Sequence, residues 1–268
     1  MERPSWAPRG VDLENPSPAR VYDYYLGGSH NFAVDRQMAR RAIELWPDLP
    51  QIMQANRAFL RRAVRYLVDQ GITQFLDIGS GIPTVGNVHE VAQAASPQAR
   101  VVYVDIDPVA VTHSRAILAG NPRADIVQAD LCNVDAILRD PRAIRLLDMT
   151  RPIGVLMVAL LHFVSDEAEP AKIITRYHEV MVPGSYLVVS HATHEGRPDQ
   201  AGSHTELYQR TSTPMTMRSW SQIEALLDLF DLVEPGVVFL PQWRPESPAD
   251  VDERPERFSG YAVVGRRG

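Results

Sequence analysis

The sequence predicts an α/β fold, in which a mostly parallel β-sheet carries helices on both faces. From residue 72 onward, short apolar segments alternate with amphipathic ones, which is the pattern of repeated strand–helix–strand units. Four of the apolar segments are nearly continuous in apolar residues, as is typical of parallel strands that are buried on both faces. Two further apolar segments close the chain, and we expect them to form an antiparallel edge of the sheet.

The elements can be placed in chain order from periodicity and from Gly and Pro positions. Strands are expected at 72–78, 100–106, 124–130, 153–160, 185–192, 232–240 and 259–267. Helices are expected at 36–46, 51–70, 87–95, 108–120, from 131 to about 148, 167–181 and 218–230. The polar stretch 193–217 is too long for an idle connection in a compact domain, so we expect a lid that contains a short helix.

Composition limits the function classes. The chain has 268 residues, 45% of them hydrophobic, and a net charge of −6, which argues against general binding to nucleic acid or an anionic membrane. Cys132 is the single cysteine, so an intrachain disulfide and a cysteine-built metal site are excluded. The longest apolar run, 153–164, is too short to span a bilayer, and we expect a cytoplasmic protein. We divide the chain into an N-terminal extension and helical cap (1–70) and a cofactor-binding domain (71–268).

A glycine-rich turn, "LDIGSGIP", follows the first predicted strand and indicates a cofactor site. A dinucleotide turn requires a third glycine where Thr84 stands, and Asp77 would lie badly beside phosphates. S-adenosylmethionine has no phosphates, and its ammonium group favours a nearby acid. Gly79 and Gly81 would let the backbone pass close to this cofactor. We therefore favour S-adenosylmethionine and keep an NAD-dependent oxidoreductase as the weaker alternative.

Acids also end the second and third predicted strands. Asp105 is placed to accept the ribose hydroxyls, with Asp107 as a rival for the same role. Asp130 is placed to accept the adenine amino group, and the backbone N–H of Leu131 to donate to a ring nitrogen. Each acid alone could be an ordinary helix N-cap, but three acids around one crevice favour a cofactor.

The ordered set "FLDIGSGIP", "VVYVDIDP", "QADL" and "IGVLMVALLHF" resembles the class I S-adenosylmethionine-dependent methyltransferases. The segments "PSPARVYDYYLGGSHNFAVDR", "NRAFLRRAVRYL", "GSGIPTVGNVHEVA" and "VEPGVVFLPQWRP" are similar to the S-adenosyl methyltransferase family of high-GC Gram-positive bacteria. This resemblance implies a Rossmann-like, seven-stranded mixed sheet of order 3-2-1-4-5-7-6, an N-terminal helical cap, and bound S-adenosylmethionine or S-adenosylhomocysteine. Ser80 and Ile106 complete the cofactor contacts that we expect at the turn and after the second strand.

The aromatic segment 20–36 is predicted to close over the cofactor, with Tyr22 and Asn31 as contacts. For most of its rings, simple packing on the sheet is the alternative. Arg57, on the next helix, is predicted to reach the cofactor carboxylate, although it is one of several arginines on that helix.

The acceptor is expected after strands four and five, where ligands of such sheets lie. No Asn/Asp-Pro-Pro-aromatic tetrapeptide occurs there, so we predict methyl transfer to an unidentified, small-molecule acceptor. His162 is the candidate general base, followed by His191 and His194. With His204 these histidines could suggest a metal, but no carboxylate pattern accompanies them and we predict no metal site. A non-catalytic S-adenosylmethionine-binding or regulatory protein remains the alternative of a different class.

Overall fold

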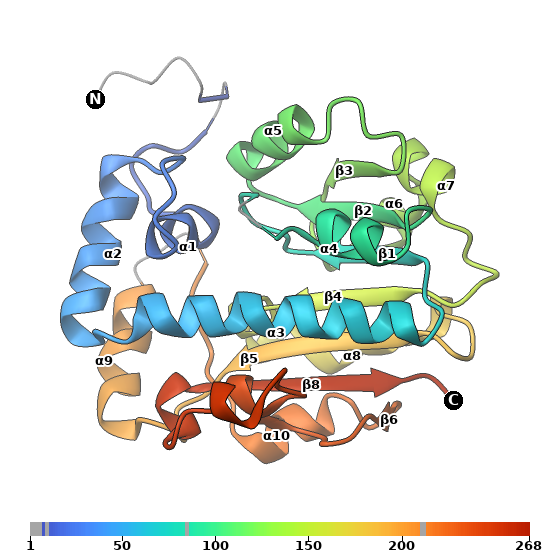
Figure 1. The fold of residues 1–268 in the computed structure, drawn as a ribbon. Helices are drawn as coiled ribbons and strands as arrows, with labels where there is room; N and C mark the ends of the chain where they lie inside the picture. The colour runs from blue at the N-terminus through green and yellow to red at the C-terminus, as the bar shows by residue number, and fades with distance from the viewer. Residues whose placement is uncertain (1–6, 9–10, 84–85, 210–212) are drawn as a thin grey trace.

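The computed structural model describes residues 7–8, 11–83, 86–209 and 213–268, and Figure 1 shows its arrangement. Its strands are β1 (Gln74–Ile78), β2 (Arg100–Asp105), β3 (Ala124–Gln128), β4 (Gly154–Val158), β5 (Tyr186–Ala192), β6 (Asp231–Leu232), β7 (Val238–Phe239) and β8 (Gly260–Arg266). Within the described residues they form one sheet of order β3-β2-β1-β4-β5-β8-β6, with β7 also paired to β8. Strands β1 to β5 are parallel, and β8 is antiparallel to β5.

This arrangement confirms the predicted fold and strand order, with one difference. The segment expected as a single strand over 232–240 forms two short strands, β6 and β7, which both pair with β8. Gly236 lies between them with φ +79°, a conformation that a turn requires and a continuous strand does not allow. In the part of the chain that is described, the sheet therefore consists of eight strands rather than seven.

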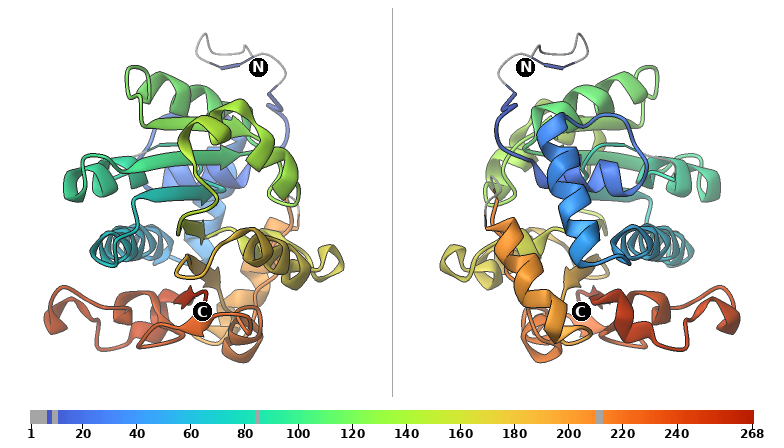
Figure 2. Two further views of the ribbon diagram at one scale, coloured as in Figure 1. Left: turned by 90° about the vertical axis from the view of Figure 1, so that its right-hand side faces the viewer. Right: turned by 90° about the vertical axis from the view of Figure 1, so that its left-hand side faces the viewer.

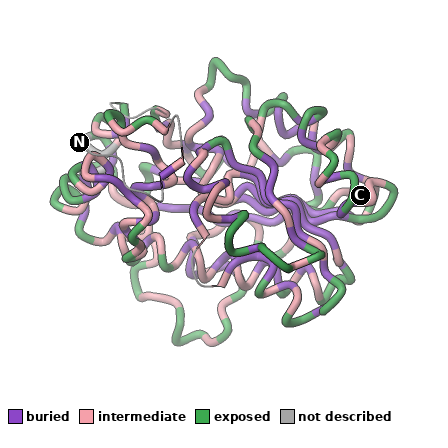
Figure 3. The backbone as a smooth tube through the Cα atoms, turned by 90° about the horizontal axis from the view of Figure 1, so that it is seen from above, coloured by how far each residue is buried: buried purple, intermediate pink, exposed green. Residues whose placement is uncertain are grey.

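Helices cover both faces of the sheet, as the apolar strands require. The helices are α1 (Pro18–Tyr25), α2 (Ala33–Leu45), α3 (Leu49–Asp69), α4 (Val88–Ala95), α5 (Pro108–Ile117), α6 (Val134–Arg139), α7 (Pro141–Leu146), α8 (Pro170–Val180), α9 (Pro198–Tyr208) and α10 (Trp220–Ala225). Short 3₁₀ turns are η1 (Leu161–Phe163), η2 (Asp166–Ala168), η3 (Leu240–Gln242), η4 (Pro248–Asp250) and η5 (Pro255–Phe258). Figure 3 shows the buried strands running through the centre, with exposed segments on the periphery.

Alternate residues of each strand build two apolar cores. Phe75, Val101 and Leu156 point to the face covered by α3 and α4. Leu76, Val102 and Val155 point to the opposite face, where they pack with residues of α6, α7, α8 and α10. This two-sided burial fixes the register of the sheet, because a shift by one residue would place each side chain on the wrong face.

Three helices lie beyond the carboxyl ends of the parallel strands. In Figure 1 these ends point to the left, toward α1, α2 and α9, and Figure 2 shows α2 and α9 side by side. Helix α1 was not expected from the sequence. Its Arg20 is buried and paired with Asp35 at 2.9 Å and Asp107 at 3.7 Å, so buried polar side chains attach it to the domain together with apolar Val21 and Tyr25.

No helix among the described residues is long and apolar enough to cross a membrane. The cytoplasmic location stays a prediction.

Candidate functional site

The glycine turn follows β1 and is held against β2. The backbone N–H groups of Gly79 and Ser80 both donate to the carbonyl of Val104. Gly79 has φ +66°, and a Cβ at this position would collide with the side chain of Leu160, which follows β4. Glycine is thus required twice over at this position: for its conformation and for the close packing of the turn on the β4 end.

Two carboxyl groups are buried beside this turn. Asp77 and Asp105 are each 6% exposed. Burial raises the pKa of Asp77 to about 7, an effect that the nearby Asp105 increases and the Arg57 guanidinium reduces. Burial also raises the pKa of Asp105 to about 6, against hydrogen bonds that stabilise its charged form. Ionising both carboxyl groups would therefore place negative charge in the crevice that the protein balances only in part. A positively charged ligand would balance the rest.

The structure separates the roles of Asp105 and Asp107. Asp105 accepts hydrogen bonds from the N–H of Gly81 at 2.7 Å and of Asp107 at 2.8 Å, so it lies directly at the turn. Asp107 caps α5 by accepting from the N–H of Val109, and it also accepts from the Ser17 hydroxyl. Asp107 therefore joins the N-terminal segment to the domain, and Asp105 is the better placed of the two for a ribose.

Arg57 and Ser80 provide polar atoms for which the described part of the chain offers no hydrogen-bond partner. A narrow cavity of about 10 Å³ is bordered by Arg57, Asp77, Ser80 and Gly81. Arg57 Nη2 donates to the carbonyl of Gly86, whereas Arg57 Nε and Ser80 Oγ are buried without a hydrogen-bond partner among the described residues. Buried polar atoms are almost always paired, so these two atoms fit a polar ligand at the turn.

Ile106 and the two residues predicted for adenine, Asp130 and Leu131, follow the ends of β2 and β3. Ile106, directly after Asp105, leaves 65% of its surface exposed, which is unusual for an isoleucine. Asp130 lies two residues beyond the end of β3 rather than at its last position, and its carboxylate accepts from the N–H of Cys132. Leu131 is half-buried, and its carbonyl accepts from the hydroxyl of Tyr177.

The N-terminal segment is organised by its own polar contacts. Asn31 donates to the carboxylate of Asp23 and to the carbonyl of Gly28, and its side-chain oxygen accepts from Arg36. Its amide thus serves the fold of the segment in this structure, and its role as a cofactor contact stays a prediction. Tyr22 accepts from the amide of Asn56 and faces a second cavity.

This second cavity lies at the ends of β4 and β5 and brings His162 and His191 together, with ring centroids 5.4 Å apart. His191 uses both ring nitrogens: Nδ1 donates to the carbonyl of Ala192, and Nε2 accepts from Arg218. Burial lowers the pKa of His191 to about 3, so this ring is neutral and structural. His162 Nδ1 accepts from the backbone N–H of Ala192 at 3.3 Å. His194 is exposed, and the side chain of His204 lies outside the described residues.

Arg218 is a residue of this site that the sequence did not reveal. It is 3% exposed and donates to the carbonyls of Leu161 and Val164, and it pairs with Asp166 at 2.6 Å. These contacts fix the loop that follows β4 and carries His162. Only its position before the capping Ser219 of α10 is visible in the sequence, and one arginine among many gives no sign of burial.

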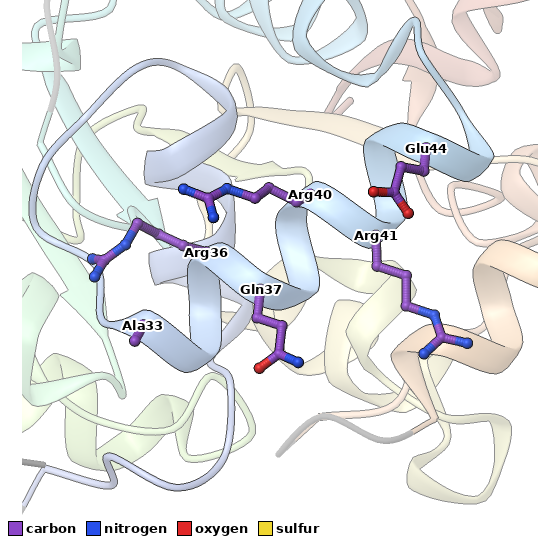
Figure 4. Close-up of a pocket in the computed structure, with 6 residues that line it drawn as sticks. All are labelled: Ala33, Arg36, Gln37, Arg40, Arg41 and Glu44. Atoms are coloured by element: carbon purple, nitrogen blue, oxygen red, sulfur yellow. The ribbon is translucent and has the colours of Figure 1, made fainter.

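A third concavity, of about 580 Å³, lies on α2 and is shown in Figure 4. The side chains of Arg36, Arg40 and Arg41 spread in different directions there rather than converging on one point. Arg36 donates to Asn31, and Arg40 donates to the hydroxyl of Tyr24, so these arginines already serve the N-terminal segment. In the described part of the chain, no group of three or more His, Cys, Asp or Glu residues is arranged to hold a metal ion.

Comparison with known proteins assigns the family. The model of the S-adenosyl methyltransferase family matches residues 4–268, so the chain belongs to this family. A DUF574 family protein from Streptomyces avermitilis is 39% identical, with a TM-score of 0.92 over 96% of this chain and 99% of the other. A candidate methyltransferase from Thermobifida fusca is 40% identical, with a TM-score of 0.92 over 98% of this chain and 99% of the other.

A more distant structure shows the fold alone. An O-methyltransferase family protein from Burkholderia thailandensis is 11% identical, with a TM-score of 0.54 over 92% of this chain and 64% of the other. None of the curated proteins compared with the chain matches it. The family assignment confirms the predicted methyltransferase class and S-adenosylmethionine as the cofactor, and the residues that hold the cofactor remain predictions.

The buried carboxyl of Asp77 gives a pH-dependent prediction. Because its folded-state pKa is raised, the folded protein retains a proton that the unfolded chain loses first, and stability falls as the pH rises from about 4 to about 7. Asp77→Asn removes this penalty. Relative to the wild type, the ligand-free variant should gain stability with rising pH, by on the order of 1–4 kcal/mol between pH 4.5 and 8.

Urea denaturation of both proteins at several pH values measures this difference. Comparing the two proteins at each pH cancels the contribution of His191, whose lowered pKa gives the opposite slope. If the difference in unfolding free energy between the wild type and Asp77→Asn does not change with pH, the pKa of Asp77 is not raised in the folded protein.

Proposed function

We propose that this protein transfers the methyl group of S-adenosylmethionine to a small-molecule acceptor, and that it holds the cofactor at the carboxyl ends of β1, β2 and β3. One observation carries this proposal: two buried carboxyl groups with raised pKa values lie at the glycine turn, beside Arg57 Nε and Ser80 Oγ, which have no hydrogen-bond partner among the described residues. When bound, S-adenosylmethionine supplies an electrophilic methyl group, and transfer leaves S-adenosylhomocysteine and a methylated acceptor.

Each predicted contact has a chemical role in this proposal. Asp77 offsets the positive charge of the cofactor ammonium, and Arg57 pairs with its carboxylate. Asp105 accepts the ribose hydroxyls, for which Gly81 brings the backbone close. The exposed side chain of Ile106 is available to pack against the adenine, so its unusual exposure is explained.

Asp130 and Leu131 lie at the far rim and complete the adenine contacts in this proposal. The backbone N–H of Ala129 donates to the carbonyl of Asp105. This bond keeps the loop after β3, which carries Asp130 and Leu131, next to the loop after β2. An acceptor at this position favours a base with an exocyclic amino group that can donate there, as adenine has.

The N-terminal extension, residues 1–70, acts as the cap. Ser17 and Arg20 attach α1 to Asp107 at the β2 end, and Tyr22 is bonded through Asn56 to Ser190 at the β5 end. Helix α1 thus extends between the cofactor crevice and the second cavity. In this position it excludes water from the reacting groups and helps to hold them in line.

His162 is better suited to donate a hydrogen bond than to remove a proton. Its Nδ1 accepts from the N–H of Ala192, so the proton of the neutral ring is on Nε2. His162 lines the second cavity, so a direct role of this ring in the reaction stays a prediction.

Two variants distinguish the cofactor contact from its neighbour. Asp105→Ala should weaken binding of S-adenosylmethionine by about 1–3 kcal/mol, because the ribose loses hydrogen bonds to a charged group. Asp107→Asn is the matched control, since it changes an acid two residues away whose contacts are to Ser17, Arg20 and Val109. Its effect should appear mainly in thermal stability. Isothermal titration calorimetry measures both affinities, and equal losses of affinity in the two variants would contradict the assignment of the ribose to Asp105.

Methyl transfer itself is tested with cofactor that carries a labelled methyl group. The wild-type protein incubated with this cofactor and a metabolite extract should transfer the label to a small molecule, detected by mass spectrometry. Asp105→Ala should reduce this transfer in parallel with cofactor binding. Tight binding of the cofactor without transfer to any component of several extracts would favour a non-catalytic regulatory protein, and binding of NAD instead would favour an oxidoreductase.

A further inference from the structure

The cavity at the ends of β4 and β5 differs in chemistry from the cofactor crevice. It measures about 80 Å³, several times the ~30 Å³ that a water molecule occupies in the liquid. Its walls come from α1, α3, the loop after β4, β5, and the segment that follows α9. Among the described residues that line it there is no Asp, Glu, Lys or Arg. The crevice beside the glycine turn, by contrast, contains Asp77, Asp105 and Arg57.

The polar side chains of the cavity are bonded to one another. Asn56 donates to the Tyr22 hydroxyl at 2.9 Å and accepts from the Ser190 hydroxyl at 2.6 Å, and Ser190 in turn accepts from the N–H of Ala159. The hydroxyls of Tyr25 and Tyr208 lie 3.3 Å apart and join α1 to α9. These bonds leave the wall with mainly aromatic and aliphatic surface.

The surroundings of the cavity do not favour an ion inside it. Burial raises the pKa of Tyr208 to about 12 and that of Tyr25 well above its usual value, because a phenolate there would be poorly solvated. Arg218, a buried cation, donates to the cavity-lining His191 and is paired with Asp166 at 2.6 Å. A charged molecule entering the cavity would therefore lose its hydration without gaining a counter-charge.

We infer that this cavity is the acceptor site and that it selects an uncharged, mainly apolar, ring-sized molecule; this inference rests on the proposed function. Tyr22, Tyr25 and Phe163 provide flat surfaces for a ring. Met53, Met215 and Met217 provide flexible walls that adjust to its outline. The specificity of the enzyme therefore lies in the absence of charge as much as in shape.

Three fluorinated probes of similar size test this selection. They are 4-fluorophenol, which is neutral at pH 7.5, 4-fluorobenzoate, which is anionic, and 4-fluorobenzylamine, which is cationic. Each is titrated into the full-length protein, with and without saturating S-adenosylhomocysteine, and its dissociation constant is obtained from ¹⁹F NMR line broadening. We expect the neutral probe to bind at least about tenfold more tightly than either charged probe.

Variants locate the binding. Met217→Trp fills the cavity and should weaken 4-fluorophenol binding at least about tenfold. Ala192→Leu adds a smaller side chain to the cavity and should also weaken this binding. Met149→Trp is the matched control, because Met149 packs against the opposite core and not in the cavity. All three variants should keep their affinity for S-adenosylhomocysteine, which also shows that they fold.

The outcomes separate the two proposals. A charged probe that binds as tightly as the phenol, no binding of any probe, or phenol binding that survives both filled variants would overturn this inference alone if S-adenosylhomocysteine still binds. Failure of the wild-type protein to bind S-adenosylhomocysteine would overturn the proposed function and this inference together.

Discussion

The structure depends on a constraint at one place: two carboxyl groups are buried together at the carboxyl edge of the sheet. Asp77 and Asp105 come from adjacent parallel strands, so the register of β1 on β2 brings them to the same edge. Burial raises the pKa of both carboxyl groups. Asp105 adds to the rise at Asp77, which Arg57 offsets only in part. Such an arrangement destabilises the ligand-free protein, and it becomes favourable once a cationic ligand is present. The conflict between stability and charge thus supports the proposed cofactor site at this edge of the sheet.

The remaining elements of the site follow from this charged crevice. A cofactor with a positive sulfonium requires a neighbouring space in which its methyl group meets a nucleophile and not water. We propose the cavity at β4 and β5 as this space, because it is apolar. Leu160, which directly precedes the turn η1 after β4, packs on Gly79 of the glycine turn. Ala159, at the end of β4, has φ +55°, a strained conformation for a residue with a side chain, and its N–H donates to Ser190. Strain of this kind is commonly retained where the backbone must approach a ligand. Helix α1 connects the two compartments.

Much of this fold could be predicted from the sequence because its strands are buried on both faces. Continuous apolar segments such as 153–160 and the Pro108 and Gly120 boundaries gave the elements and their order. The charged residues at strand ends identified the crevice, since an acid directly after an apolar strand has a defined position in space. The elements that the sequence did not predict depend on polar contacts or on contacts between distant segments. Helix α1 depends on buried Arg20 and Asp35, which a search for apolar periodicity does not detect.

The candidate site was only partly predictable for the same reason. The tyrosines of α1 are visible in the sequence, but no sequence pattern indicates that Asn31 bonds to Asp23, eight residues earlier in its own segment. Arg218 acquires its role only when the loop after β4 folds back on it, over a separation of more than 50 residues. Side-chain hydrogen bonds between distant segments have no periodicity, so they leave no pattern that a single sequence can reveal.

The central claim is that the charged crevice and the uncharged cavity form one continuous active site. A crystal structure of the wild-type protein with S-adenosylhomocysteine tests it most directly. The account predicts ribose hydroxyls bonded to Asp105, the adenine beside Ile106, and the thioether sulfur facing the cavity at Ala159 and Ser190. A nucleoside bound away from Asp105, or a sulfur directed away from the cavity, would contradict it.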